Sequence, residues 1–382
     1  MTKTGWRVPL AVLVVAGLTA VLAVLLIHVS PVGAQAVCSG TQVNPGDDLD
    51  AIVNSDSRYT ATTFCLNPNP DGSVATYNIS ATLLLKDGDR IVGQEGATET
   101  RGPATYGHPV VAIRPSVALD KLVSAMGKGN EIKWVDLAGA TGRVVNGNPQ
   151  TGTGVAITAG SADSNFLVQY VVVHGNDAAG ILSARGRVLN SEFYDNTNNA
   201  AFLGFNGSAM KNITEYEAAY NYVHNEQGTG IWCDVGCTDD PARQNGYWVH
   251  DNLVVDNGRS GIRYESSPTD LAPGVHQSQS TALIEDNEVH GNSYNEDKGG
   301  ISARDTQNAL IRNNVFGAKT IAGVYYRANA GKPGAVRASD SGRTSRTDLW
   351  NIDIVNNDLN GEGLNGCELS DKVVYCANNN YR

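Results

Sequence analysis

Phenylalanine is scarce in this 382-residue chain, which has only 6 Phe beside 42 Gly. So many glycines, together with many Asn and so few Phe, argue against a helical bundle and favour short strands joined by turns. The chain has no P-loop, no dinucleotide-binding glycine pattern and no G-x-S-x-G turn, so it lacks these phosphate-binding and hydrolase signatures. Its formal net charge of −11 argues against a nucleic-acid partner and counts mildly against a strongly anionic polysaccharide.

The N-terminus has the features of an export signal. A basic start around Lys3 precedes an apolar run over residues 8–27, and Ala34-Gln35-Ala36 forms a cleavage pattern. The apolar run is also nearly long enough to span a bilayer, so a retained membrane anchor is the alternative. Both interpretations place the protein outside the cytoplasm, either secreted or on the cell surface. Residues 1–36 are therefore set apart, and residues 37–382 are expected to form one domain and a monomer.

Six cysteines agree with export, because each has a partner nearby in the sequence and disulfides form in oxidising compartments. A zinc site at Cys233 and Cys237 is the alternative. No second Cys or His pair stands at zinc spacing, so no metal is expected. Proximity predicts three local disulfides: Cys38–Cys65, Cys367–Cys376 and Cys233–Cys237.

One pattern recurs four times in the second half of the chain. Each unit has a polar start with Asn, a short apolar strand, a second polar turn, then Gly and an Ile or Val. A unit of about 23 residues cannot bury a core alone, so repetition predicts a stack of coils made of short strands. The four units are Tyr220–Asp234, Asp251–Glu265, Asp286–Arg304 and Asn313–Arg327.

Asparagines hold equivalent places in successive units and are expected to stack as a ladder at one corner of the coil. Asn tolerates left-handed backbone and bonds locally to the main chain, which suits a tight corner. The four residues are Asn252, Asn287, Asn314 and Asn357. Ahead of the stack, Asp47 or Asp48 is expected to cap a short helix that covers the open end.

Other segments do not fit the repeat and are expected to leave the stack. Residues 95–108 are predicted as a loop between early coils, and residues 205–216 as an excursion. Insertions are expected at 238–246, 267–280 and 293–298, and a surface loop at 328–347. Residues 352–360 are predicted to be the last coil.

The chain resembles secreted right-handed parallel β-helix repeat proteins of the pectate-lyase-like superfamily over about residues 40–380. The resemblance implies an all-β solenoid, a right-handed parallel β-helix with a short N-terminal capping helix. It says little about activity, because this fold carries lyases, hydrolases, epimerases and adhesins.

Charged residues close the four units, each standing four residues after its Gly, and stacking would align them in one column: Asp234, Glu265, Arg304 and Arg327. Adjacent coils of a sheet lie about 4.8 Å apart. The carboxyls of Asp234 and Glu265 are therefore expected about 5–6 Å apart, close to the 5–5.5 Å that retaining glycoside hydrolases need.

The W-x-D pattern on one coil and G-I-x-x-E-S on the next are similar to the site of retaining β-helix hydrolases of the β-xylosidase type. This resemblance implies Asp234 as nucleophile and Glu265 as acid/base, with a polysaccharide or oligosaccharide as substrate. Trp232 is expected to offer a flat face on which a sugar can stack. The predicted substrate-binding residues are Trp232, Arg263, Arg304, Arg327, His224 and His290.

Three alternatives compete with the hydrolase. The charged column could be an ion ladder that keeps the coils in register. A lyase or epimerase acting on uronates would use Asp234 and Glu265 to hold Ca²⁺, a cofactor the hydrolase does not need, and Arg304 to abstract a proton. A non-catalytic carbohydrate-binding or adhesive module would use the flat faces of the solenoid only for binding.

Overall fold

The computed structural model describes residues 38–55, 61–159, 165–183, 185–212, 216–234, 246–265, 282–295, 298–331, 334–339, 349–367 and 373–382. Cys38–Arg382 forms a compact unit. The expected export signal, residues 1–36, lies outside the described part of the chain. Within that part, no helix combines the length and apolar character needed to cross a membrane.

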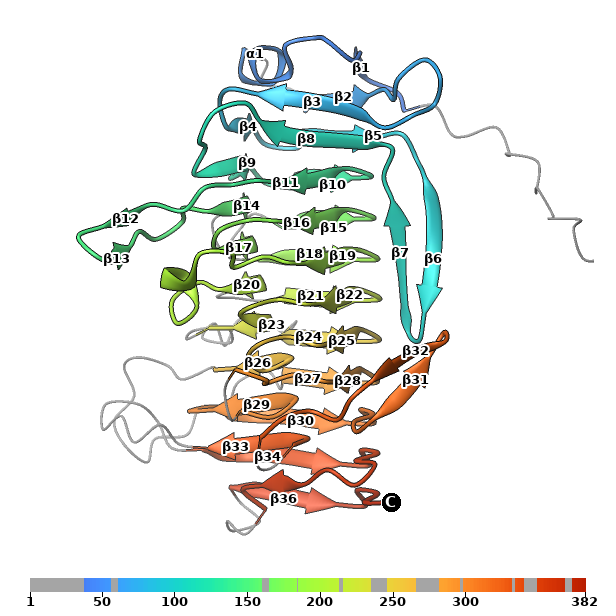
Figure 1. Cartoon of the computed structure of the whole chain (residues 1–382), viewed down its shortest axis with the longest axis vertical. Coiled ribbons are helices and arrows are strands. Elements are labelled where there is room, and N and C mark those ends of the chain that lie inside the picture. Colours follow the sequence, from blue (N-terminus) through green and yellow to red (C-terminus); the bar gives the residue numbers. More distant parts are fainter. Residues whose placement is uncertain are drawn as a thin grey trace, which may run out of the picture. The chain divides into compact units, whose positions relative to one another are not determined.

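Three long parallel sheets run along the stack, and successive strands of the chain enter them in turn (Figure 1). Sheet A contains β1 (Thr41–Val43), β2 (Thr63–Leu66), β5 (Arg90–Gly93), β10 (Glu131–Lys133), β15 (Phe166–Gln169), β18 (Gly186–Leu189), β21 (Tyr216–Ala219), β24 (Tyr247–His250), β27 (Ala282–Glu285), β30 (Gln307–Arg312), β34 (Trp350–Val355) and β36 (Val374–Ala377). Sheet B contains β3 (Ala75–Ile79), β8 (Val111–Pro115), β11 (Asp136–Ala138), β16 (Val172–His174), β19 (Glu192–Tyr194), β22 (Tyr222–His224), β25 (Leu253–Val255) and β28 (Glu288–His290). Sheet C contains β4 (Leu83–Leu85), β9 (Lys121–Ala125), β14 (Val155–Ala159), β17 (Ala179–Ser183), β20 (Ser208–Asn212), β23 (Thr229–Cys233), β26 (Ile262–Tyr264), β29 (Ile301–Arg304), β33 (Val336–Ser339) and β35 (Leu364–Asn365).

The core fills the space enclosed by the three sheets. Side chains alternate across a strand, so one residue of each short strand points inward and its neighbours point out. In sheet B the inward positions of three successive rungs are Val223, Val254 and Val289, which align in register and are fully buried. β-branched residues recur at these sites because the same slot repeats on every rung. The predicted stack of coils is confirmed, and β36 adds a coil beyond the expected last one at 352–360.

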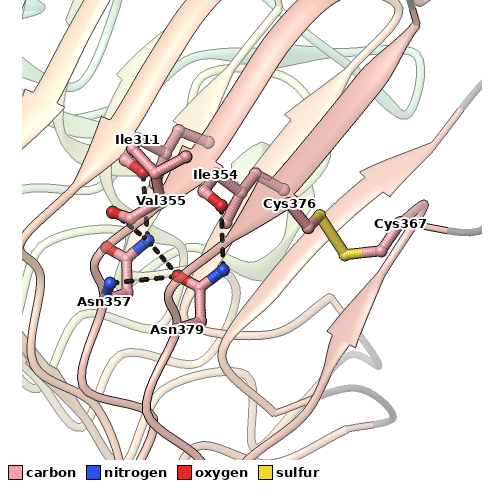
Figure 2. The surroundings of a disulfide bond; sticks show 7 residues. All are labelled: Ile311, Ile354, Val355, Asn357, Cys367, Cys376 and Asn379. Atoms are coloured by element: carbon pink, nitrogen blue, oxygen red, sulfur yellow. Dashed lines mark hydrogen bonds between the residues drawn. A yellow bond between two sulfur atoms is a disulfide. The ribbon is translucent and has the colours of Figure 1, made fainter. Parts of the chain in front are cut away.

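Two buried ladders of polar side chains line the corners next to sheet B. The predicted ladder is confirmed: the side-chain oxygen of each Asn accepts from the backbone N–H and the amide of the Asn one coil earlier. It runs from Asn221 through Asn252, Asn287, Asn314 and Asn357 to Asn379, whose contacts Figure 2 shows. A second ladder, not predicted, contains Asn176, Asn196, Glu226, Asn257, Asn292, Asn329 and Glu362.

Removing one rung of the first ladder is expected to be costly. Asn287 is fully buried, accepts two hydrogen bonds from Asn252 and donates to Val249, Glu285 and Asn314. Asn287→Ala leaves buried donors and acceptors without partners, so it should lower the free energy of unfolding by about 3 kcal/mol or more. Urea unfolding measures this against Asn148→Ala, which changes an exposed Asn. Equal stability of the two variants would contradict the prediction.

Local cross-links and a short helix close the ends of the stack. Helix α1 (Leu49–Asn54) is capped by the Asp48 side chain, which accepts from the Ala51 N–H. The predicted Cys38–Cys65 and Cys367–Cys376 disulfides are both present, and the second joins the last coil to the segment before it (Figure 2). Cys233 is also disulfide-bonded, and Cys237, its predicted partner, lies outside the described residues.

Two antiparallel hairpins extend from the stack, and they correct one prediction. The expected loop at 95–108 is the hairpin β6 (Ala97–Arg101) and β7 (Ala104–His108), which Figure 1 shows running along the stack towards a second hairpin, β31 (Lys319–Ile321) and β32 (Val324–Tyr326). The two hairpins pack against sheet B through a small apolar core, and burial of these side chains attaches the hairpins to the stack. The core contains Ala104, Tyr106, Tyr222, Leu253, Val255, Ile321 and Tyr326. A third hairpin joins β12 (Val144–Val145) to β13 (Asn148–Pro149).

The expected excursion at 205–216 is also wrong in its centre. Residues Ser208–Asn212 form β20, a regular rung of sheet C between β17 and β23. Among the described residues next to β20, the preceding segment, with the short 3-10 helix η1 (Ala200–Phe202), leaves the coil. The predicted insertions at 238–246 and 267–280 lie almost wholly outside the described residues. The predicted surface loop at 328–347 is wrong over Val336–Ser339, which form β33, a rung of sheet C between β29 and β35. Residues 332–333 and 340–347 lie outside the described part of the chain.

Candidate functional site

The two predicted carboxylates project from neighbouring rungs of sheet C. Asp234 directly follows β23 and Glu265 directly follows β26, and these strands pair in register with Cys233 opposite Tyr264. The Glu265 N–H donates to the Cys233 carbonyl at 2.9 Å, which carries the parallel pairing through to the carboxylates. The adjacency expected from the repeats is therefore present.

A lysine that the sequence interpretation missed holds Asp234. Lys211 Nζ lies 2.9 Å from Asp234 Oδ2. The same ammonium donates to the Phe205 carbonyl at 2.6 Å and to Asn206 Oδ1 at 3.1 Å, so three acceptors surround it. Burial lowers the pKa of Lys211, and the Asp234 carboxylate opposes that shift. Lys211 therefore fixes Asp234 in position and balances its charge.

Glu265 is buried among donors. Its Oε2 accepts from Trp232 Nε1 at 3.1 Å, and its Oε1 accepts from Arg263 Nη2 at 2.5 Å. Arg304 Nη1 lies farther away, 3.8 Å from the same Oε1. Both oxygens are thus engaged, and the arrangement without substrate presents Glu265 as an acceptor.

The expectation that Trp232 offers an open face to a sugar is wrong. The side chain points outward as strand alternation requires, but Trp232 is only 3% exposed. Lys211 and Arg263 flank Trp232 in register on the two adjacent rungs. Their charged groups lie 4.0 Å and 4.6 Å from the centre of the indole. The Trp232 ring is therefore held between two cations and serves to build the cluster.

Arg304 joins this cluster, whereas Arg327 does not. Arg304 ends β29, its side chain is 23% exposed, and its place in the column is continued by Ser339 on β33. Arg327 follows the hairpin strand β32 instead, with Nε 3.4 Å from Asp256 Oδ1 and its guanidinium over the Tyr294 ring. The placement of Arg327 in the column was wrong because the hairpin repeats the sequence pattern of a coil without occupying a rung.

His224 and His290 lie on sheet B, not beside the carboxylates of sheet C. The outward residues His174, Tyr194 and His224 align on successive rungs. Their rings stack with centres 4.7 Å and 5.2 Å apart, and His224 Nε2 lies 3.0 Å from Glu192 Oε1. His290 continues the column two rungs later but is fully buried and bonded to the Gly317 carbonyl. The predicted substrate-binding set is thus divided between two faces.

The sequence offered one signal for Lys211. Its segment, Ser208–Asn212, aligns with Thr229–Cys233 in register, so Lys211 holds the place of Trp232 one coil earlier. Gly204, Gly207 and the Asn-x-Ser sequence that begins at Asn206 made that rung resemble a loop. Calcium would have to displace Lys211 and Arg263 to reach Asp234 and Glu265, and the described residues hold no group of three or more His, Cys, Asp or Glu arranged for a metal.

No family model matches the chain, and no curated protein matches its sequence. Among solved structures, it is similar to the A-module of the mannuronan C-5 epimerase AlgE4 from Azotobacter vinelandii, with TM-score 0.52 and 13% identity over 88% of this chain and 92% of that one. The tailspike gp49 of Acinetobacter baumannii bacteriophage Fri1, a capsular polysaccharide depolymerase, has TM-score 0.47 and 10% identity over 90% and 55% of the two chains. Pectate lyase Pel9A has TM-score 0.38 and 14% identity over 76% and 70%. With its three parallel sheets and its likeness to the AlgE4 A-module, the chain is thus a right-handed parallel β-helix, as its sequence predicts.

Proposed function

We propose that the protein is an exported enzyme that acts on polysaccharide, and that it is a retaining glycoside hydrolase. The observation that carries the proposal is the placement of Asp234 and Glu265 on adjacent, registered rungs of sheet C. A spacing of about 4.8 Å between the two rungs fits the carboxyl separation of about 5–5.5 Å in retaining enzymes better than that of about 6.5–9.5 Å in inverting enzymes.

The proposed reaction has two steps. An Asp234 oxygen attacks the anomeric carbon while the bond to the leaving sugar breaks, and the Glu265 carboxyl gives its proton to the departing oxygen. Water then attacks the glycosyl ester, Glu265 takes the water proton, and Asp234 leaves as a carboxylate. Two inversions at one carbon give net retention.

The neighbouring cations have supporting roles in this proposal. Lys211 positions Asp234 as a charged nucleophile. Arg263, which binds Glu265 without substrate, must turn to a substrate hydroxyl so that Glu265 can carry its proton. Arg304, the most exposed of these cations, faces the bound sugar.

Polysaccharide as the substrate class and export are parts of the same proposal. The epimerase AlgE4, whose fold the chain shares, acts on mannuronan, a carbohydrate polymer. The two described disulfides support an oxidising compartment. The predicted signal or anchor at residues 1–36 would bring the protein there.

The cations also favour a second candidate, a lyase or epimerase acting on uronates. Positive charge gathers around the site from Lys211, Arg263 and Arg304. These cations would neutralise the carboxylate of a uronate, and so stabilise the negative charge that develops when the proton on the neighbouring carbon is removed. In that case Arg304 takes the proton. The pairing of Asp234 and Glu265 with these cations leaves their Ca²⁺-binding role without support.

Product analysis separates the two candidates. Wild-type protein is incubated with aryl glycosides and with uronate polysaccharides, with and without EDTA. We expect reducing sugar that retains its anomeric configuration by proton NMR, EDTA or not. An unsaturated product that absorbs in the ultraviolet, or C5 inversion of the polymer without cleavage, would replace the hydrolase with the second candidate. Binding without any product would indicate a non-catalytic module.

A further inference from the structure

A large aromatic side chain stands out on the outer face of sheet A. Trp248 on β24 is 40% exposed, although Glu217 and Leu283 flank it on the two adjacent rungs. The outward column that passes through it is in register over five rungs: Arg187, Glu217, Trp248, Leu283 and Leu310. Sheet A is a different face from the Asp234–Glu265 cluster of sheet C.

The indole of Trp248 is held in place on two sides. Its Nε1–H donates to Glu285 Oε1 at 2.9 Å, and Glu285 Oε2 in turn accepts from Arg312 Nε at 2.6 Å. The His250 ring stacks on the indole with centres 3.8 Å apart, and His250 is fixed by Asp251 at 2.8 Å. A large side chain therefore remains exposed with little freedom left to lose on binding.

We propose that the outer face of sheet A around Trp248 binds a neutral polysaccharide chain at a site separate from the one that cleaves it. The C–H groups on one side of a sugar ring match a flat aromatic face, and its hydroxyls need donors and acceptors at the rim. Trp248 supplies the first, and the Glu285–Arg312 and Glu217 side chains supply the second.

The charge around Trp248 selects a neutral polymer over an acidic one. Among the described residues around it there are four carboxylates (Glu217, Asp251, Glu285, Asp286) and two guanidiniums (Arg187, Arg312). Burial lowers the pKa of His250, but Glu217 and Asp251 raise it above its ordinary value, so this ring counts with the cations. Because the carboxylates outnumber the cations, a uronate polymer would be repelled. A mixture of acceptors and donors is suited to uncharged hydroxyls.

The outward column orients the bound polymer along the solenoid axis. Beyond Leu283 and Leu310 the same outward position is held by Asp353 and then by Tyr375, which is 44% exposed. Four rung steps separate Trp248 from Tyr375, a distance of about 19 Å at the rung spacing. An extended polymer lying parallel to the solenoid axis would touch both aromatic side chains. Such binding needs no cleavage, so it goes beyond the proposed hydrolase activity.

Affinity electrophoresis of the full protein tests the proposal, with xylan, barley β-glucan, galactomannan or polygalacturonate cast in the gel. We expect at least one neutral polymer to retard the wild type, and Trp248→Ala to weaken that retardation at least about tenfold. Asp234→Asn, altered only at the other face, should be retarded as strongly as the wild type. Tyr325→Ala removes a 68% exposed aromatic from the β31–β32 hairpin and should behave as the wild type.

Measurements of activity and stability separate the proposed sheet A binding site from the proposed hydrolase activity. Trp248→Ala should stay folded, with a melting temperature somewhat lowered by the loss of the Glu285 bond and the His250 stacking. It should keep its kcat on a small aryl glycoside, because the Asp234–Glu265 cluster lies on another sheet. Equal retardation of Trp248→Ala and wild type, retardation by polygalacturonate alone, or no retardation by any of the four polymers overturns the sheet A site. Failure of the hydrolase proposal would instead appear as an inactive wild type that still binds through Trp248.

Discussion

Asp234→Asn is expected to lower kcat on an aryl glycoside by at least about 10³-fold, because an amide cannot form the glycosyl ester that splits the reaction into two steps. The change is small in shape, and the amide oxygen can still accept from Lys211, which lies 2.9 Å from Asp234 in the wild type. Circular dichroism and thermal unfolding should therefore show a folded protein. The measurement is steady-state kinetics with substrate well above KM.

Three comparison variants make this result specific. Glu265→Gln should depend on the leaving group: the loss is small for an acidic phenol and about 10²–10⁴-fold for a sugar, because only the poor leaving group needs a proton. Lys211→Met breaks the ion pair but keeps the nucleophile, so it should retain more activity than Asp234→Asn. Glu131→Gln changes a carboxylate that pairs with cations on sheet A and should be neutral.

An ion ladder predicts the opposite pattern. If Asp234, Glu265 and their cations only keep the rungs in register, Asp234→Asn and Lys211→Met would lower the melting temperature together. Any loss of activity would then follow the loss of folded protein. Full activity of stable Asp234→Asn would remove the nucleophile assignment outright.

The parts of the structure that depend on register alone could be predicted from the sequence. A repeated slot asks for the same side chain on every coil, so the spacing of Asn252, Asn287 and Asn314 was enough to predict the ladder. The same logic placed Asp234 beside Glu265, since both end equivalent strands. Two of the local disulfides could be predicted from proximity in the sequence.

The parts that depend on neighbouring side chains could not be predicted. Alternation correctly pointed Trp232 outward, but its 3% exposure comes from Lys211 and Arg263 on the flanking rungs. Lys211 itself was missed because the turn before β20 resembles a loop. Arg327 was misplaced because a hairpin strand and a coil strand have the same local pattern, and only long-range pairing distinguishes them.

The second ladder contains a carboxyl group where the other interior rungs have amides. Glu226 is fully buried, its Oε1 accepts from Asn196 Nδ2 at 2.7 Å, and its N–H donates to Asn257 Oδ1 at 3.1 Å. Its Oε2 has no hydrogen-bond partner among the described residues. Burial raises the pKa of Glu226 to about 8, nearby Asp195 adds to the rise, and the bond from Asn196 opposes it.

The raised pKa makes stability depend on pH in a definite direction. The folded protein binds this proton more tightly than the unfolded chain, whose Glu has its ordinary pKa of 4.5. The stability that the proton supplies is therefore complete below about pH 4.5 and is lost as pH rises through about 8. Because a tenfold difference in proton affinity corresponds to about 1.4 kcal/mol, the loss has a ceiling of about 5 kcal/mol.

Glu226→Gln is expected to remove this loss, because a neutral amide has the shape of the protonated acid and cannot ionise. Urea unfolding should show similar stability for wild type and variant near pH 5, and a variant more stable by a few kcal/mol near pH 9.

Glu362 in the same ladder is the matched control. Burial raises the pKa of Glu362 too, but its oxygens accept from the Asn329 N–H, the Asn329 amide and the Gly317 N–H. An amide at Glu362 would set its own N–H groups against these donors, so Glu362→Gln should bring no gain. Parallel pH profiles for the wild type and Glu226→Gln would mean that Glu226 carries its charge inside the fold.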